Sequence, residues 1–264
     1  MTGLDDVAGD EGRDARKELI ATTKSRWAQE LSSMNEEEDD PGTTWNQRAR
    51  AAKPDWMSPR MAWRAIQSAL PRNAIISSDI GNNCAIGNAY PDFDEGRKYL
   101  APGLFGPCGY GLPSIVGAKI GQPDVPVVGF AGDGAFGIAV NELTAIGRGE
   151  WPPITQIVFR NYQWGAEKRN STLWFDDNFV GTELDEEVSY AGIAKACGLQ
   201  GVIARTQDEL TDALNQAIKD QMENGKTTLI EAMINQELGE PFRRDAMKKP
   251  VEVAGISAAD MAAE

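Results

Sequence analysis

The stretch that decides the fold is PVVGFAGDGAFG, from Pro126 to Gly137. A short apolar run is followed by Gly-Asp-Gly and then by small and apolar residues, which predicts a buried strand that ends where a helix begins. A carboxylate between two glycines at this place has two interpretations. It is either a plain turn, because Asp and Gly fill many turns, or part of a site for a cation and a diphosphate.

The surrounding chain repeats this pattern of strand and helix. Apolar runs predict strands at Ala74–Ser78, Val125–Ala131, Ile154–Arg160, Gly201–Ala204 and Thr228–Met233. Helical stretches lie between them, at about Tyr110–Ile120, Phe136–Gly147, Ser189–Ala196 and Gln207–Met222. The alternation predicts an α/β fold, a doubly wound and mainly parallel sheet with helices on both faces. Ligands of such sheets bind at the carboxyl ends of the strands.

The chain before this domain has a different pattern. Apolar residues at helical spacing predict an amphipathic helix over about Arg13–Met34, carried by Ile20, Trp27, Leu31 and Met34. The acidic run from Glu36 to Asp40 is interpreted as a solvated linker. Ser58 can cap a second helix that has Pro59 at its first position. We expect an acidic helical extension in residues 1–53, a cofactor-binding domain in 54–240 and a tail in 241–264.

Composition excludes several classes of function. The 264 residues carry 26 Lys and Arg against 40 Asp and Glu, a net charge of −14, which argues against nucleic acid as a partner. Histidine is absent, so His-dependent nucleophilic catalysis and His-based zinc sites are excluded, and a cofactor is expected to carry the proton traffic. The three scattered cysteines predict reduced thiols. Because no signal-peptide pattern or apolar stretch of transmembrane length is present, we expect a cytoplasmic protein with no membrane partner.

The strand ends are suited to a metal and a diphosphate. Glycines let the backbone approach a ligand, and N–H groups at a helix start favour phosphate. Asp133 would repel a diphosphate unless a cation lay between them, and Mg²⁺ prefers oxygen ligands of this kind. Asn161 lies at the carboxyl end of the next predicted strand, with 26 residues between it and Gly134, and a helix and strand of that length return the chain beside the first strand. Its amide oxygen suits the same cation.

These segments resemble a known cofactor motif. Gly-Asp-Gly followed about 25 residues later by an Asn-containing turn is similar to the motif of thiamine diphosphate-dependent enzymes, the superfamily of acetolactate synthases and decarboxylases. The segment GLFGPCGYGLPSIVGAKIGQPDVPVVGFAGDGAFG, from Gly103 to Gly137, resembles the diphosphate-binding part of these enzymes. The stretch from Gly132 to Glu187 and the ending INQELGEPFRRDAMKKP resemble more closely the sulfoacetaldehyde acetyltransferase family.

The resemblance implies a role for each matching residue. Asp133 and Asn161 match the side chains that bind Mg²⁺, and Gln163 matches a residue that donates its backbone carbonyl to the metal. Gly106 matches the glycine whose carbonyl receives the amino group of the cofactor's pyrimidine. Cys108 takes the place of the apolar residue that keeps the cofactor bent. The residues expected along the diphosphate are Gly81, Asn82, Asn83, Gly132, Gly134 and Ala135.

The chain departs from the family pattern at three points. Arg160 stands where many relatives have the first of two asparagines, the spacing is about one residue longer, and Cys108 is smaller than the usual Met, Ile or Leu. Cys108 is therefore either a packing residue, as Cys often is in apolar sites, or a determinant of specificity. Lys168 and Arg169 are candidates for binding a substrate anion, with Arg160 behind them; the alternative is a solvated pair in a loop. Glu142 also matches a family position, where a structural role is equally open.

The narrower resemblance implies conversion of sulfoacetaldehyde and phosphate into acetyl phosphate and sulfite. Thiamine diphosphate brings its own aminopyrimidine base, which agrees with the absence of histidine. In these enzymes a glutamate on a separate pyrimidine-binding domain activates that base. We therefore expect this chain to need a partner carrying the pyrimidine-binding and central domains, in a homo- or hetero-oligomer. Two alternatives stay open: a subunit of a sulfopyruvate-type decarboxylase or acetolactate synthase-like enzyme, and a truncated remnant without activity.

Overall fold

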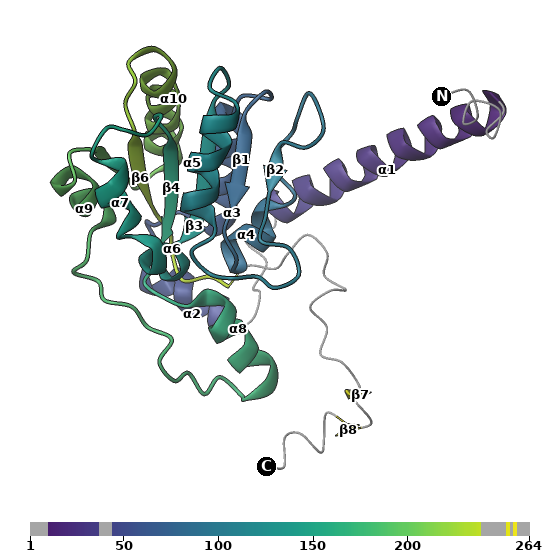
Figure 1. Ribbon diagram of the computed structural model, residues 1–264. Helices are drawn as coiled ribbons and strands as arrows, with labels where there is room; N and C mark the ends of the chain where they lie inside the picture. The colour runs from purple at the N-terminus through teal and green to yellow at the C-terminus, as the bar shows by residue number, and fades with distance from the viewer. Residues whose placement is uncertain (1–9, 37–43, 239–251, 254–255, 258–264) are drawn as a thin grey trace. The chain divides into compact units, whose positions relative to one another are not determined.

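The computed structural model describes residues 10–36, 44–238, 252–253 and 256–257 (Figure 1). The chain forms two compact units, Met1–Pro41 and Gly42–Glu264. The first unit contains α1 (Asp10–Glu36), which confirms the helix predicted there. Its apolar side chains Leu19, Ile20 and Trp27 are exposed. The acidic run interpreted as a linker falls, beyond Glu36, outside the described residues.

The second unit is built on a six-stranded sheet in the order β2-β1-β3-β4-β6-β5, with every pair parallel. The strands are β1 (Ile75–Ser78), β2 (Tyr99–Leu100), β3 (Val127–Gly132), β4 (Thr155–Arg160), β5 (Gln200–Ala204) and β6 (Thr228–Met233). Five of them confirm predicted strands. The sixth, β2, is missing from the prediction because an edge strand of two residues is too short to show a hydrophobic pattern.

The strand order creates a switch point between β1 and β3. After β1 the chain crosses to β2 on one side, whereas after β3 it crosses to β4 on the other. Ser78 of β1 pairs with Phe130 of β3, and Gly132 of β3 pairs with Phe159 of β4. The three strands therefore end close to one level. Carboxyl ends beside such a switch point form the usual ligand crevice of open α/β sheets.

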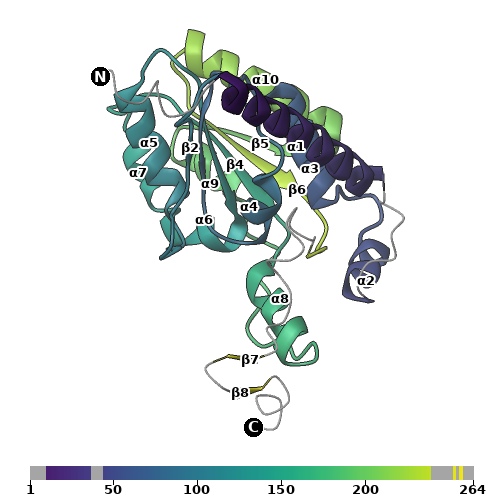
Figure 2. The same ribbon diagram turned by 90° about the vertical axis from the view of Figure 1, so that its right-hand side faces the viewer.

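Helices cover both faces of the sheet (Figure 2). One face carries α5 (Gly111–Gly121), α6 (Asp133–Ala139), α7 (Glu142–Ile146) and α9 (Tyr190–Ala196); the other carries α3 (Pro59–Ala69), α4 (Asn82–Gly87) and α10 (Gln207–Glu223). The predicted doubly wound α/β fold is confirmed. The single helix predicted over Phe136–Gly147 is wrong, because it begins at Asp133 and is divided into α6 and α7. The break is small, since Val140 and Asn141 keep right-handed helical torsion angles.

Apolar packing on both faces holds the helices that border the strand ends. On the α3 face, the Trp63 ring packs against Phe130, with centroids 4.8 Å apart, and against Phe159 at 5.2 Å. The Trp63 indole N–H also donates to the carbonyl of Asn83 at 2.9 Å, which ties α3 to the start of α4. The core on the other face includes Leu112, Ile115, Phe136, Leu143 and Ala194.

The shorter elements were only partly foreseen. The capped start of α3 is confirmed, because Ser58 Oγ accepts the N–H of Met61 at 3.1 Å. The helices α2 (Thr44–Ala52), α4 and α8 (Gly165–Trp174) are not among the predictions; α8 reads GAEKRNSTLW and has no apolar stripe. β7 (Glu252–Val253) pairs with β8 (Ile256–Ser257). No helix within the described ranges is long and apolar enough to cross a membrane. The domain boundaries at 53 and 240 stay predictions.

Candidate cofactor site at three strand ends

The predicted site residues lie at the ends of three adjacent strands. Asn161 and Gln163 follow β4, while the segments beside β3 and β1 are Gly132–Ala135 and Gly81–Asn83. A side-chain carbon added at Gly132 would lie 3.8 Å from the amide nitrogen of Asn83, and one added at Gly165 would lie 3.6 Å from Asn82 Cβ. The structure thus brings these segments together. We call Gly81–Asn83, Gly132–Ala135 and Asn161–Gln163 the strand-end site.

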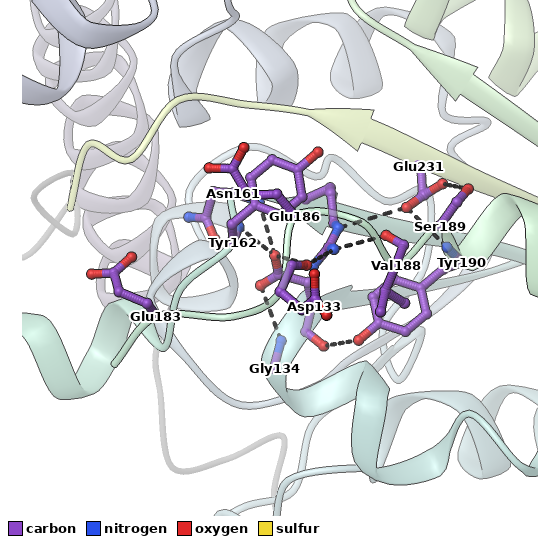
Figure 3. A network of polar contacts seen from close by, with 12 residues as sticks. Asp133, Gly134, Asn161, Tyr162, Glu183, Glu186, Val188, Ser189, Tyr190 and Glu231 are labelled. Atoms are coloured by element: carbon purple, nitrogen blue, oxygen red, sulfur yellow. Dashed lines mark hydrogen bonds and ion pairs between the residues drawn. The ribbon is translucent and has the colours of Figure 1, made fainter. Parts of the chain in front are cut away.

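Asp133 is the buried carboxylate of this site. Its Oδ2 accepts the backbone N–H groups of Asn161 at 3.0 Å and Tyr162 at 2.6 Å, and it accepts a bond from Arg160 Nη1 at 3.2 Å. Its Oδ1 accepts the N–H of Gly134 at 3.0 Å (Figure 3). The two oxygens are therefore used differently: Oδ2 is anchored by three donors, and Oδ1 by one among the described residues.

Tyr162 gives the turn after β4 its shape. Its φ of 60° lies in the left-handed region, which residues other than glycine rarely adopt. This conformation directs successive N–H groups, of Asn161 and Tyr162, to the same oxygen of Asp133. The Tyr162 ring lies under the Arg160 guanidinium, 4.1 Å from ring centroid to Cζ. The turn after β4 and the Asp133 carboxylate thus hold each other in place through these hydrogen bonds.

The protonation of Asp133 reflects its burial. Burial raises the pKa of Asp133 to about 6, against the opposing effects of the Tyr162 N–H and the Arg160 charge. The hydrogen-bond donors and the guanidinium favour the charged form, but desolvation is the larger effect. The carboxyl is therefore mostly ionised at neutral pH, as a metal ligand must be.

Arg160, which the sequence analysis placed behind the candidate anion-binding pair, is buried. It is 1% exposed, and its Nη2 donates to the backbone carbonyls of Asp185 at 2.5 Å and Val188 at 2.8 Å. Its Nε lies 3.7 Å from Glu231 Oε1. Arg160 is therefore a buried link between the strand-end site, the segment before α9 and β6.

Lys168 and Arg169, the predicted anion-binding pair, have different environments. Lys168 is fully buried, and its ammonium forms an ion pair with Glu183. Arg169 Nη1 donates to Asn82 Oδ1 at 2.7 Å. Arg169 therefore contacts the strand-end site directly. The positive charge of Lys168 is instead paired with Glu183, in the segment that follows α8. A role in binding a substrate anion stays a prediction.

Gly106 and Cys108 lie on a loop that Asp79 holds in place. The Asp79 carboxylate accepts the N–H groups of Gly109 at 3.1 Å and Gly111 at 2.8 Å, and also that of Ile80 at 2.8 Å. Gly106, with φ 62°, takes the left-handed conformation that the loop requires. Cys108 is half-buried, and its pKa is raised by burial and by the nearby Asp79 and Glu167 charges. The thiol is thus neutral at pH 7.

Asp79 is a residue to which the sequence analysis assigned no role. It directly follows β1 and precedes Ile-Gly, much as Asp133 follows β3 and precedes glycine. This similarity to Asp133 was the feature of the sequence from which a role for Asp79 could have been predicted. Burial raises the pKa of Asp79, against several backbone N–H donors. Glu142, which matches a family position, is exposed on α7 and accepts a bond from Asn141 Nδ2 at 3.3 Å.

The donor set fits a hard cation and a diphosphate. Asp133 Oδ1 has the fewer donors, and the Asn161 side chain, 4% exposed, makes no hydrogen bond with any described residue. Gln163 Nε2 donates to the carbonyl of Gln236 at 3.1 Å, whereas its Oε1 is buried with no hydrogen-bond partner among the described residues. Carboxylate, amide and carbonyl oxygens are the ligands Mg²⁺ uses when phosphate and water complete its shell. A carbon added at Gly134 would lie 2.7 Å from the Trp164 ring, so this glycine is required for close packing.

Comparison with known families identifies the cofactor class. A family model described as "Thiamine pyrophosphate enzyme, C-terminal TPP binding domain" matches residues 79–232. The matched span begins at Asp79 and contains all three strand ends. The chain belongs to the thiamine pyrophosphate enzymes. Thiamine pyrophosphate is another name for thiamine diphosphate, so the family's cofactor carries the diphosphate that the strand-end site fits.

The curated relatives are considerably longer than this chain. It is 84% identical over 261 residues to a sulfoacetaldehyde acetyltransferase of Roseovarius nubinhibens, covering 99% of this chain and 43% of that protein. It is 41% identical over 248 residues to a sulfoacetaldehyde acetyltransferase of Alcaligenes xylosoxydans xylosoxydans, covering 92% of this chain and 41% of that protein. The chain therefore spans about two fifths of the relatives it matches.

More distant proteins share the fold of the cofactor domain. Acetolactate synthase 1 of Nicotiana tabacum is 29% identical over 171 residues, covering 62% of this chain and 26% of that protein. A thiamine diphosphate-dependent 4-hydroxybenzoylformate decarboxylase of Rhodococcus jostii RHA1 has a similar structure, with a TM-score of 0.62 and 22% identity, over 70% of this chain and 34% of that chain. The latter likeness supports the fold alone.

Proposed function

We propose that this chain is the cofactor-binding portion of a sulfoacetaldehyde acetyltransferase. The reaction is the conversion of sulfoacetaldehyde and phosphate into acetyl phosphate and sulfite, in the cytoplasm. The observation that carries the proposal is the 84% identity, across 99% of this chain, to the Roseovarius nubinhibens protein of that name. Identity to the tobacco acetolactate synthase is 29% over 62% of the chain, which favours the acetyltransferase over the synthase.

The cofactors are thiamine diphosphate and Mg²⁺. Asp133 Oδ1, the Asn161 amide and the Gln163 backbone carbonyl hold the metal. Gly106 and Cys108 border the pyrimidine, and the diphosphate lies along Gly81, Asn82, Asn83, Gly132, Gly134 and Ala135. When bound, the cofactor supplies the base, the nucleophile and the electron sink for reactions at a carbonyl. The residues of this chain bind and orient it, which is consistent with a site that contains no histidine.

Arg169 is the residue of this chain that we assign to an anionic group of the substrate. It contacts Asn82 at the edge of the strand-end site, where its guanidinium can pair with a sulfonate or a phosphate. Lys168 is less suited to this role, because it is fully buried and ion-paired with Glu183. The support for Arg169 is its position and its charge.

A partner chain completes the active site in this proposal. Four apolar side chains beside the strand-end site are exposed: Ile80, Leu104, Phe105 and Ile138. Leu104 and Phe105 belong to the loop that also carries Gly106 and Gly109, and Ile80 and Ile138 lie beside it, because a carbon added at Gly106 would lie 3.3 Å from Ile80 and one added at Gly109 would lie 3.3 Å from Ile138. Contiguous exposed apolar side chains are typical of an interaction site. We assign this surface to the pyrimidine-binding domain of a partner that also carries the central domain, in a homo- or hetero-oligomer.

Reconstitution tests the proposal. The 264-residue chain is mixed with the part of the Roseovarius nubinhibens protein that precedes the region of identity, together with Mg²⁺ and thiamine diphosphate. We expect sulfite release from sulfoacetaldehyde that depends on phosphate, and its loss when the chain carries Asp133→Ala. Carbon dioxide from sulfopyruvate without sulfite would instead identify a decarboxylase subunit. Cofactor binding with no turnover of either substrate would identify a remnant.

A further inference from the structure

Arg160 lies at the centre of a buried charge cluster formed by Asp133, Arg160 and Glu231. Each of the three is at most 2% exposed. Arg160 Nη1 is 3.2 Å from Asp133 Oδ2, and Arg160 Nε is 3.7 Å from Glu231 Oε1. Two carboxylates and one guanidinium leave the cluster with a charge of −1 when both acids are ionised. Without Arg160 the same charge would be −2.

Glu231 has partners besides the arginine. Its carboxylate accepts the hydroxyl of Ser189 at 2.7 Å and the N–H groups of Tyr190 and Ala191, each at 3.0 Å. It therefore caps the start of α9. The charge of Glu231 is stabilised by this helix end, so the opposite charge of Arg160 remains available to Asp133.

The position of Arg160 is determined on every side. Its Nη2 holds the carbonyls of Asp185 and Val188. Its guanidinium carbon lies 4.1 Å from the Tyr162 ring centroid and 5.2 Å from that of Tyr190. The Arg160 bond reaches Oδ2 of Asp133, and not Oδ1, which accepts only the N–H of Gly134 among the described residues. A cation bound at Oδ1 would therefore be repelled by the Arg160 guanidinium, which remains bonded to Oδ2 of the same carboxylate.

We propose that Arg160 is a positioning residue that makes the strand-end site take a divalent metal and a diphosphate together. It anchors Oδ2, so that Oδ1 faces the cation site. Its fixed charge opposes a divalent cation that arrives alone and attracts a diphosphate, and such effects are strong in a buried, weakly screened place. The inference rests on the proposed function, in which the site binds Mg²⁺ with thiamine diphosphate.

A purely structural role gives a different expectation. If Arg160 only tied the Asp185–Val188 segment to the sheet, its substitution would lower the free energy of unfolding and would not tighten binding of a lone metal. Removing Arg160 does not release Asp133, because the N–H groups of Gly134, Asn161 and Tyr162 still hold the carboxylate. The electrostatic effect can therefore be measured separately.

The experiment measures Mn²⁺ binding to the full 264-residue chain by the electron paramagnetic resonance signal of free Mn²⁺. Each variant is titrated alone, with pyrophosphate and with thiamine diphosphate, at several pH values up to about 8.5. The pH is varied because Arg160 lowers the pKa of Asp133, so in its absence a proton competes with the metal at the lower of these pH values. In Arg160→Gln, we expect lone Mn²⁺ to bind at least about tenfold more tightly, and the gain from adding either diphosphate to fall by a similar factor. Arg160→Lys retains the charge and should retain most of the coupling between metal and diphosphate.

Control variants separate an effect of Arg160→Gln on folding from its electrostatic effect on metal binding. Lys119→Met removes another buried cation, which bonds the carbonyls of Pro123 and Val125 before β3, and it should leave Mn²⁺ binding unchanged. If Arg160→Gln does not fold, Arg160→Met, which removes the same charge and keeps an unbranched side chain beside the Tyr162 and Tyr190 rings, takes its place. Unchanged or weaker binding of lone Mn²⁺ in the folded variant would overturn the inference. Failure of the unmodified chain to bind Mn²⁺ with thiamine diphosphate, even when mixed with the part of the Roseovarius nubinhibens protein used in the reconstitution, would instead overturn the proposed function.

Discussion

Asp79 and Asp133 occupy equivalent places in the sheet and have different surroundings. Both are buried carboxylates at the carboxyl ends of adjacent parallel strands, and both are close to glycine in the sequence. Backbone N–H groups bind both oxygens of Asp79: Ile80 and Gly109 on Oδ1, and Gly111 on Oδ2. Asp133 has three donors on Oδ2, one of them Arg160, and one donor on Oδ1.

The two aspartates differ in how many hydrogen-bond donors each oxygen has, and this difference distinguishes a structural carboxylate from a candidate ligand. Asp79 closes the loop that carries Gly106 and Cys108 onto β1, so its capacity as an acceptor is used within the protein. Asp133 is held mainly through Oδ2, whereas its Oδ1 accepts a single N–H among the described residues, and it is this Oδ1 that the proposed function assigns to the metal. A carboxylate at a strand end is therefore not a site in itself. The distribution of donors over its two oxygens decides between the two roles.

The largest expected effect is that of Asp133→Ala on cofactor binding. Losing even an outer-shell partner of a metal ligand costs roughly 10–100-fold in affinity. Removing the charged ligand itself should therefore weaken Mg²⁺-dependent binding of thiamine diphosphate by more than about 100-fold. Titration calorimetry measures the affinity, and the far-ultraviolet circular dichroism spectrum should stay that of the folded chain. Unchanged affinity would show that Asp133 is not the metal ligand.

Asp79→Asn should act on stability rather than on the metal. Three backbone N–H groups would lose a charged acceptor in a buried place, so we expect the free energy of unfolding to fall by about 2 kcal/mol. Urea unfolding measures it, with the exposed Asp124→Asn as a matched control. Affinity for Mn²⁺ in the presence of pyrophosphate should change less than about twofold, because the metal ligands are elsewhere. A loss of metal affinity as large as that of Asp133→Ala would erase the distinction between the two aspartates.

Asn161→Ala tests the neutral member of the site. It removes an amide oxygen and no charge, so the loss in Mg²⁺-dependent binding of thiamine diphosphate should be about tenfold, smaller than that of Asp133→Ala. The backbone N–H of Asn161 still reaches Asp133 in this variant, because that bond does not use the side chain. The same calorimetric titration compares the two. An equal or greater loss for Asn161→Ala would reverse the ranking.

The smallest expected effect is a pH dependence of stability at Asp79. Burial raises the pKa of this carboxyl in the folded chain, so the folded state keeps its proton at pH values where the unfolded state has lost it. Stability then falls as pH rises from the ordinary pKa of Asp, about 4, through the raised value. The free-energy advantage of the unmodified chain over Asp79→Asn should therefore grow on acidification. Urea unfolding at several pH values measures it, and an advantage that shrinks would show that the N–H donors outweigh burial.

Periodic hydrophobicity was sufficient to predict most of the scaffold. Five of the six strands of the sheet and the helices α3, α5, α9 and α10 have clear apolar patterns, and the fold class follows from their alternation. The elements it missed are short or polar. The α8 sequence has no apolar stripe, and its place depends on contacts such as the buried Lys168 with Glu183. The break between α6 and α7 lies at Val140 and Asn141, so no Gly or Pro in the sequence marks it.

The sequence predicted that glycine, aspartate and asparagine follow three strands, and the structure brings these residues together at one edge of the sheet; their role as a cofactor site stays a prediction. The sequence did not show which buried charged groups pair with one another. Arg160 looked like a departure beside an anion site, yet it lies between Asp133 and Glu231, residues 27 positions before it and 71 after it in the chain. Local pattern specifies residue type and element, whereas the partner of a buried charge is chosen by whichever residues the sheet brings within a few ångströms. That choice belongs to the tertiary structure.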